Sequence, residues 1–258
     1  FSSRRRHTRF RNVTGVQTCA LPISDMRGRY PAWYVRETVE GSLKRLGVEQ
    51  LDLLQLHCWA PDLVHSLDWL EVLNDMRLEG KINKIGVSLR DYRPNEGILA
   101  AKLNLVTSVQ VIFNMFEQRP ATEGLFEACG ASNTAAIARV PMDSGSLSGM
   151  WTPDTPSTWV KGSVQDQLFG GERFKKTYDR VEELKKVVAP YYSSLAEAAM
   201  RYSISSPQVS TTIPGMSNAK SVDRNIAYSD GQPFPQDLIS KIAEFNWPRN
   251  YYKISSPA

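Results

Sequence analysis

Three polar side chains that could do chemistry stand in short apolar segments of the chain. His57 ends the run LDLLQLH, Ser88 ends INKIGVS, and Gln110 lies within SVQVIFN. An imidazole can polarise a carbonyl group or move a proton, and a hydroxyl or a carboxamide can hold a polar ligand. Each residue also has a simpler explanation, as a polar residue where a core strand emerges into a loop.

These segments are too short for independent helices, and their leucine and β-branched content favours buried strands. The first strands are centred about 26 to 31 residues apart, which is the interval of a strand, a helix and their loops in a (β/α) barrel. In such folds the carboxyl ends of the strands carry the chemistry. The predicted strands are Leu51–His57, Ile82–Ser88, Ser108–Asn114, Ala135–Pro141 and Val209–Pro214.

Apolar residues spaced three or four apart predict helices between these strands. Gly47 and Gly80 follow two of them as stop signals. A long segment from Met142 to about Phe174, rich in Gly, Ser, Pro and Trp, is typical of a functional lid or of disorder. The helical segments are Trp33–Leu46, Leu67–Met76, Ile98–Leu103, Leu125–Cys129, Tyr178–Val188, Leu195–Tyr202, Val222–Tyr228 and Leu238–Phe245.

Composition excludes several classes of protein. The chain has 258 residues, 41% of them hydrophobic, which suits one globular domain or two small ones. Three cysteines at unrelated spacings give neither a disulfide framework nor a metal pair, so a cytoplasmic location is expected. Three scattered histidines argue against a metal site, and no apolar run is long enough to span a membrane.

The net charge of +4 belongs to the first 24 residues. This head contains five arginines and no acid, which leaves 26 basic and 27 acidic residues in the rest of the chain. The body therefore has no predicted basic face, and we expect no nucleic-acid partner.

The head itself has three interpretations: a transit peptide, a nucleic-acid-binding arm, or a non-native segment. Its run VTGVQTCALPIS resembles the conceptual translation of sequencing-adapter sequence. We favour the non-native or disordered interpretation, and exclude residues 1–24 from the fold.

Five motifs stand in the order and at about the spacing found in the aldo-keto reductases: LDLLQLH, GKINKIGVS, VQVIFN, ARVPMDSGSLSG and TTIPGMSNAKSVDRN. Residues 33 to 247 thus resemble that family, and the segment after Met142 resembles the long loop of its soluble bacterial members. The resemblance implies a (β/α)8 barrel that transfers hydride between NADPH and a carbonyl or alcohol substrate. The resemblance also implies which residues contact the substrate and the cofactor.

His57 matches the active-site histidine that hydrogen-bonds the substrate carbonyl oxygen. Two residues, Ser88 and Gln110, match the partners of the nicotinamide carboxamide, although Leu89 stands where Asn or Arg is usual. Arg139 stands where an aromatic residue often stacks on the nicotinamide. Met142 and its neighbours match the pyrophosphate loop, Gly215 and Ser217 match the phosphate turn, and Asn225 matches the adenine contact. Ser221 and Arg224 stand where Gln and Glu are common in the family's cofactor site.

The phosphate turn also has a physical rationale of its own. Gly215 lets the backbone approach an anion, and the helix that follows presents free N–H groups and the positive end of its dipole. Lys220 and Arg224 add positive charge. An ordinary capped helix is the competing explanation.

The resemblance also predicts what this chain lacks. The family's tyrosine acid and its aspartate and lysine partners match no residue here. We therefore expect residues 25–258 to form a partial barrel, with strands four to eight present and strands one to three missing. Such a barrel would have little or no turnover and would self-associate through open sheet edges. A non-catalytic NADP-binding or partner-binding module is the alternative, and the segment Trp247–Tyr252 is expected to shape a substrate pocket.

Overall fold

The computed structural model describes residues 30–249, so the predicted non-native head lies outside the described residues. The chain divides into two compact units. Unit 1 contains the described residues up to Val111 together with Gly124–Ala136, and unit 2 contains Ile112–Glu123 and the residues from Ile137 onward.

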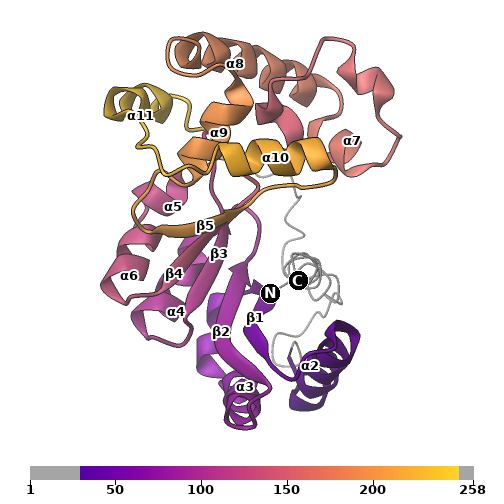
Figure 1. Ribbon diagram of the computed structural model, residues 1–258, viewed down its shortest axis with the longest axis vertical. Helices are drawn as coiled ribbons and strands as arrows, with labels where there is room; N and C mark the ends of the chain where they lie inside the picture. Colours follow the sequence, from indigo (N-terminus) through magenta and orange to yellow (C-terminus); the bar gives the residue numbers. More distant parts are fainter. Residues whose placement is uncertain (1–29, 250–258) are drawn as a thin grey trace. The chain divides into compact units, whose positions relative to one another are not determined.

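The five predicted strands are confirmed, with small changes at their ends. The strand order is β1-β2-β3-β4-β5, so neighbours in the sheet are also neighbours in the sequence. β1 pairs with β2, and β2 with β3, in parallel (Figure 1). The strands are β1 (Leu51–Trp59), β2 (Ile82–Leu89), β3 (Ser108–Ile112), β4 (Ala135–Arg139) and β5 (Val209–Ile213).

The assignment of these strands as four to eight of a barrel without its first three is wrong. The strand order and the register show which strands are neighbours. They do not show which of a barrel's eight strands each one corresponds to. Counting strands within a short sequence therefore could not establish that others are missing.

In unit 1, helices cover one face of the strands. Leu54 and Leu56 of β1 and Val87 of β2 are buried, as are Val72 and Leu73 on the inner side of α3. α3 contacts both β2 and α2 (Figure 1). The elements are α2 (Ala32–Leu46), η3 (Pro61–His65), α3 (Asp68–Leu78), η4 (Pro94–Gly97), α4 (Ile98–Lys102) and α6 (Leu125–Ala131).

Helix α2 ends where the sequence predicts. Gly47 adopts φ 63°, a left-handed conformation that glycine reaches without steric cost, and its N–H donates to the carbonyl of Lys44. The backbone thus turns within a few residues from the helix into β1.

In unit 2, α8 contacts α7, α9 and α11, and buries Phe174, Val181, Leu184 and Val188 along one face (Figure 1). The elements are α5 (Arg119–Thr122), η5 (Asp143–Ser148), η6 (Thr155–Thr158), α7 (Val164–Phe169), α8 (Glu172–Val188), α9 (Leu195–Ser203), α10 (Ala219–Ala227) and α11 (Gln236–Ala243).

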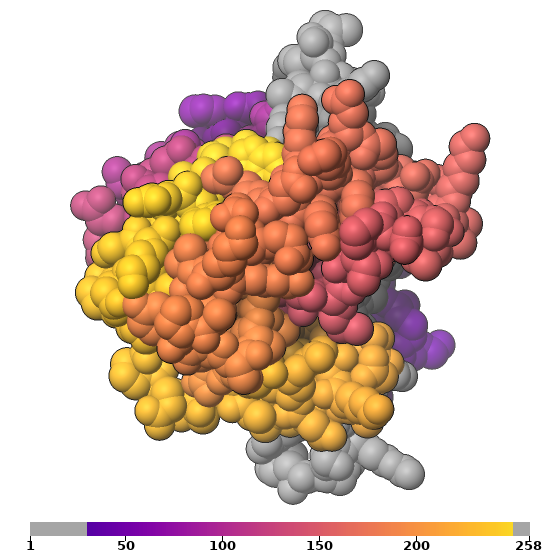
Figure 2. Space-filling model, turned by 90° about the horizontal axis from the view of Figure 1, so that it is seen from above, coloured from indigo at the N-terminus to yellow at the C-terminus, as the bar shows by residue number. Residues whose placement is uncertain are grey.

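The long segment after β4 is not structureless. It contains η5, η6, α7 and the start of α8, and the pink-to-salmon part of it stands out beside the orange α8 in Figure 2. Trp151 packs edge-on against Phe169 and Trp159, with ring centroids 4.9 and 5.5 Å apart. These aromatic contacts supply an apolar core for a segment whose Gly and Pro content suggested a loop.

Candidate active site

The register of the parallel strands brings three predicted site residues into one row. His57 on β1 pairs with Ser88 on β2, and Ser88 pairs with Gln110 on β3. Side chains at paired positions of a sheet point to the same face. His57 and Ser88 lie toward the carboxyl ends of β1 and β2, where ligands of parallel α/β folds bind, and Gln110 lies at the middle of the shorter β3.

A second polar row lies two residues earlier on the same face. Gln55 pairs with Gly86, which pairs with Ser108. A Cβ on Gly86 would lie 2.2 Å from the Ser108 Oγ, so glycine is needed for this close approach. The Ser108 Oγ and the Gln55 Oε1 are buried and have no hydrogen-bond partner within residues 30–249. This face therefore carries polar atoms where a strand buried by apolar packing would carry methyl groups.

His57 differs from its row partners in exposure and backbone. Ser88 and Gln110 are 1% and 0% exposed, whereas His57 is half-buried. The register shifts between His57 and Trp59, and the intervening Cys58 has φ 57°. Such a bulge increases local twist and can re-aim a neighbouring side chain. The Tyr30 hydroxyl donates to the His57 carbonyl oxygen and fixes the backbone there.

Two predicted cofactor residues of unit 2, Arg139 and Met142, lie at the end of β4 and in the loop that follows it. Arg139 is the last residue of the strand and is half-buried, and its carbonyl accepts from the N–H of Phe113 at 3.2 Å. Met142 begins the loop into η5, and its carbonyl accepts from Gly145 and Leu147. These backbone bonds curl the loop into a compact turn.

The remaining predicted residues lie between β5 and α10, also in unit 2. Gly215, Ser217 and Arg224 are exposed and Ser221 is half-buried. A Cβ on Gly215 would meet no atom within 4 Å. Asn225 is 3% exposed, and its amide donates to the Gly215 carbonyl at 3.1 Å. In this structure Asn225 therefore braces the turn from the helix beneath it.

Three features of these regions were missed from the sequence. Asn218 caps α10, because its side chain accepts from the Ser221 N–H at 3.0 Å; an Asn before a helical stripe is a signal that could have found it. Asn114 is fully buried and bridges the ends of β3 and β4. Arg249 pairs with Asp143, and no sequence signal links residues so far apart.

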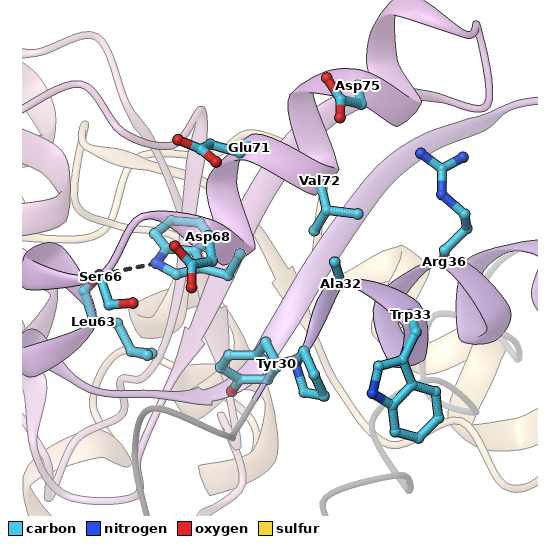
Figure 3. Close-up of a pocket in the computed structure, with 12 residues that line it drawn as sticks. Tyr30, Ala32, Trp33, Arg36, Leu63, Ser66, Asp68, Glu71, Val72 and Asp75 are labelled. Atoms are coloured by element: carbon cyan, nitrogen blue, oxygen red, sulfur yellow. Dashed lines mark hydrogen bonds between the residues drawn. The ribbon is translucent and has the colours of Figure 1, made fainter.

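The cavity shown in Figure 3 has a volume of about 530 Å³ and lies in unit 1 between α2 and α3. Tyr30 and Arg36 line it opposite the carboxylates of Asp68, Glu71 and Asp75. No predicted site residue lines this cavity. Three carboxylates repel phosphate groups, so we do not assign a nucleotide to it.

Other site classes find no support within residues 30–249. No group of three or more His, Cys, Asp or Glu side chains could hold a metal ion, and no helix is long and apolar enough to cross a membrane. Burial raises the pKa of the Cys129 thiol to about 11, so this thiol stays protonated near neutral pH and is a poor nucleophile.

Residues 16–246 match the model of the aldo/keto reductase family. Among curated relatives, D-threo-aldose 1-dehydrogenase of a Pseudomonas species is 26% identical over 81% of this chain and 61% of its own length. The NADH-specific methylglyoxal reductase of Escherichia coli is 24% identical over 75% of this chain and 58% of its own length. The chain spans about three fifths of the length of such relatives.

Solved structures agree on the fold. A glycerol dehydrogenase from Gluconobacter oxydans has a TM-score of 0.68 at 22% identity, covering 84% of this chain and 64% of its own. The holo form of an aldo-keto reductase from Bacillus halodurans has a TM-score of 0.67 at 22% identity, covering 85% of this chain and 66% of its own.

These comparisons overturn the prediction that strands one to three are missing. The solved structures are aldo-keto reductase barrels that match most of this chain, and the family match begins at residue 16, inside the head that we excluded. The prediction rested on the family's aspartate, tyrosine and lysine, which match no residue of this chain, and on a count of five strands. Neither an unmatched motif nor a strand count shows that part of the barrel is missing, and residues 16–24 fall within the family match.

Proposed function

Since the chain belongs to the aldo/keto reductase family of oxidoreductases, we propose that it serves NADPH-dependent hydride transfer between a carbonyl and an alcohol. The observation that carries the proposal is the row of His57, Ser88 and Gln110, which are paired positions on three adjacent parallel strands. This chemistry needs a group that polarises the carbonyl close to the groups that hold the nicotinamide carboxamide. The pairing of His57 with Ser88, and of Ser88 with Gln110, supports assigning these roles to the three residues.

His57 is proposed as the group that hydrogen-bonds the substrate carbonyl oxygen and stabilises the charge developing on it. Ser88 and Gln110 would hold the nicotinamide carboxamide through a hydroxyl and an amide. A reduced nicotinamide supplies the hydride when it is bound. The contribution of the chain's own residues is to bind, orient and polarise, and the bulge at Cys58 helps to set the direction of the His57 ring.

The residues of unit 2 suit the phosphate groups of a nucleotide. Met142 and its loop would receive the pyrophosphate. Arg139 lies nearby in the sequence, at the end of β4, the strand that precedes this loop. The exposed turn at Gly215 has open space above its backbone, and the first turn of α10 carries Lys220 and no acid. An anion is stabilised at such a helix end.

The adenine end of the cofactor is proposed to lie on α10 and on the turn that precedes it. The residues are Gly215, Ser217, Ser221, Arg224 and Asn225, and their hydroxyl, guanidinium and amide groups match a phosphorylated ribose better than a plain one. NADP is therefore the proposed cofactor. The relative named as NADH-specific makes NADH the necessary comparison in any binding experiment.

Titration of the 258-residue chain with NADPH and with NADH, followed by tryptophan fluorescence, tests binding. We expect saturable quenching by NADPH and at least about tenfold weaker binding of NADH, which is the discrimination given by one charge-assisted contact. Arg224→Gln should narrow this difference, whereas Lys176→Gln on α8 serves as a surface-charge control. Equal affinities for both nucleotides in the unaltered chain would exclude the proposed NADP preference.

Turnover is proposed to be low, because no residue of this chain was matched to the family's tyrosine acid. A positioned general acid contributes about 10²- to 10⁴-fold to the rate. Oxidation of NADPH should be measured with methylglyoxal, and reduction of NADP+ with a D-threo-aldose, which are the compounds in the names of two relatives. Any activity should fall at least about tenfold in His57→Ala while NADPH binding persists.

A non-catalytic nucleotide-binding module remains the second candidate. NADPH quenching without carbonyl-dependent oxidation, unchanged in His57→Ala, would favour that candidate. Turnover that is lost in His57→Ala would favour the reductase.

A further inference from the structure

The loop that follows β4 has an unusually strained backbone. Val140, Asp143 and Ser144 have φ of 58°, 46° and 54°, and Gly145 has φ 108°. Only glycine adopts this region freely, and a β-branched residue such as Val140 is disfavoured there. Strain of this kind persists only where surrounding contacts over-determine it, and it concentrates at functional sites.

Asn114 holds the beginning of this loop. Its side-chain amide donates to the Val140 carbonyl at 2.9 Å. Its side-chain oxygen accepts from the N–H groups of Phe116 and Glu117, each at 2.9 Å. Because Asn114 is fully buried, the end of β4 is tied to the turn that follows β3.

Arg249 holds the middle of the loop. Its Nη2 donates to the Oδ1 of Asp143, and the two residues are 8% and 1% exposed. The Oδ2 of Asp143 accepts from the Ser146 Oγ at 2.5 Å. Breaking a buried pair of this kind is costly because it leaves a charge away from water without its partner.

Aromatic rings and backbone bonds fix Arg249 in turn. Its guanidinium carbon lies 4.7 Å from the Trp247 ring centroid and 5.1 Å from that of Phe116. The Trp247 N–H donates to the Phe116 carbonyl at 2.8 Å, and the Asn246 side chain accepts from the Gln118 N–H at 3.3 Å. The C-terminal segment 246–249 is thus docked on the same turn that Asn114 organises.

We propose that Arg249 is a positioning residue of the cofactor site, which acts through Asp143 on the loop Val140–Ser146. It holds the loop in the shape that receives the pyrophosphate, and it neutralises a carboxylate that would otherwise repel that anion. The proposal has two parts. The cofactor part, that Arg249 raises the affinity of the loop for the pyrophosphate, rests on the proposed function. The mechanical part, that Arg249 holds the shape of the loop, rests on the contacts alone. A segment more than a hundred residues away in the sequence thereby sets the affinity of the loop.

Three variants of the full chain test this proposal. Arg249→Met removes the charge and keeps an unbranched apolar side chain, and Arg249→Lys keeps the charge but loses the planar fork. Arg180→Met is the matched control. Arg180 also lies against the Trp247 ring, at 5.4 Å, but it donates to the Glu244 carbonyl and not to Asp143.

Hydrogen exchange in the absence of nucleotide reports on the loop itself. The N–H groups of Gly145 and Leu147, which donate to the Met142 carbonyl, are the reporters. Arg249→Met should accelerate their exchange by a larger factor than it accelerates exchange in α9, and Arg180→Met should leave the reporters as they are. Equal acceleration of exchange in the two variants would contradict the proposal. It would show that Arg249 affects the loop only by packing against the Trp247 ring, as Arg180 does.

NADPH affinity reports on the cofactor part. Arg249→Met should weaken binding at least about tenfold, Arg180→Met less than about twofold, and Arg249→Lys by an intermediate amount. Adding Asp143→Asn to Arg249→Met should recover part of the loss, because the uncompensated charge is gone. Asn also tolerates the left-handed backbone at this position.

The two readouts separate the possible failures. If the unaltered chain binds neither NADPH nor NADH, the proposed function and the cofactor part fall together, and the exchange experiment still decides the mechanical part. If nucleotide binds and Arg249→Met changes loop exchange but not affinity, the positioning role is wrong and only the mechanical contact remains.

Discussion

The row of His57, Ser88 and Gln110 in unit 1 and the loops of unit 2 that carry the proposed cofactor residues are built in different ways. The row is placed by strand pairing, which fixes each side chain through its backbone neighbours. The loops are placed by single side chains: Asn114 and Arg249 for the β4 loop, and Asn225 for the turn at Gly215. The row is therefore positioned mainly by backbone pairing, whereas the loops are positioned by side chains from other parts of unit 2.

The largest expected effect comes from breaking the buried ion pair between Arg249 and Asp143. Arg249→Met should lower the free energy of unfolding by about 3–5 kcal/mol, because it leaves Asp143 buried and uncompensated. Urea denaturation followed by circular dichroism measures the loss. Lys175→Met is the control: its partner Asp179 and Lys175 itself are largely exposed, and removal of that pair should cost no more than about 1 kcal/mol. Comparable losses in the two variants would contradict the contrast.

Two glycines give a second test, one in each region. Gly86→Ala should destabilise the chain by about 1–3 kcal/mol, because the new Cβ meets the Ser108 Oγ at 2.2 Å in a buried position. Ser108→Ala should relieve most of that loss, since it removes the clashing atom. Gly215→Ala should change stability by less than about 0.5 kcal/mol, because its Cβ meets nothing, yet it should weaken NADPH binding. An unchanged affinity would argue against an anion at Gly215.

The cap of α10 provides a smaller effect. Asn218→Ala should cost about 1 kcal/mol, because the Ser221 N–H loses its side-chain acceptor, while Asn218→Asp should preserve the cap. Hydrogen exchange along α10 measures the local change. Thermal denaturation of the same variants shows whether the effect spreads through unit 2. If Asn218→Ala has no effect on either, the turn is held by Asn225 alone.

The smallest expected effect depends on pH. A side-chain hydrogen bond from Arg201, followed by a backbone bond from Gln232, lowers the pKa of Asp230 from 3.8 to about 2. A carboxyl whose folded pKa is depressed contributes stability above its unfolded pKa, and that stability is lost as the pH falls toward the folded pKa. Unfolding experiments should therefore show a constant difference between the chain and Asp230→Asn above about pH 4, which shrinks between about pH 4 and pH 2. A difference independent of pH throughout this range would show that the Arg201 contact does not hold the charge.

Much of the fold could be predicted because local patterns decide it. The runs around Leu54, Ile85 and Val111 are short and apolar, and they form strands; the stripes ending at Gly47 and Gly80 form helices. The segment around Trp151 could not be predicted in the same way. Its helices are stabilised by contacts of the Trp151 ring with Phe169 and Phe174, which come much later in the sequence. Roles of the matched site residues, self-association and a cytoplasmic location stay predictions.

The sequence by itself determined the strands, the family and the presence of polar residues at the strand ends, since each follows from periodicity or from a contiguous motif. Only the tertiary structure decided which of those residues are neighbours and what holds the loops. Strand register aligned His57, Ser88 and Gln110, and a buried pair joined Asp143 to Arg249. The physical reason is that pairing and burial are set by residues distant in the sequence, which no local pattern records.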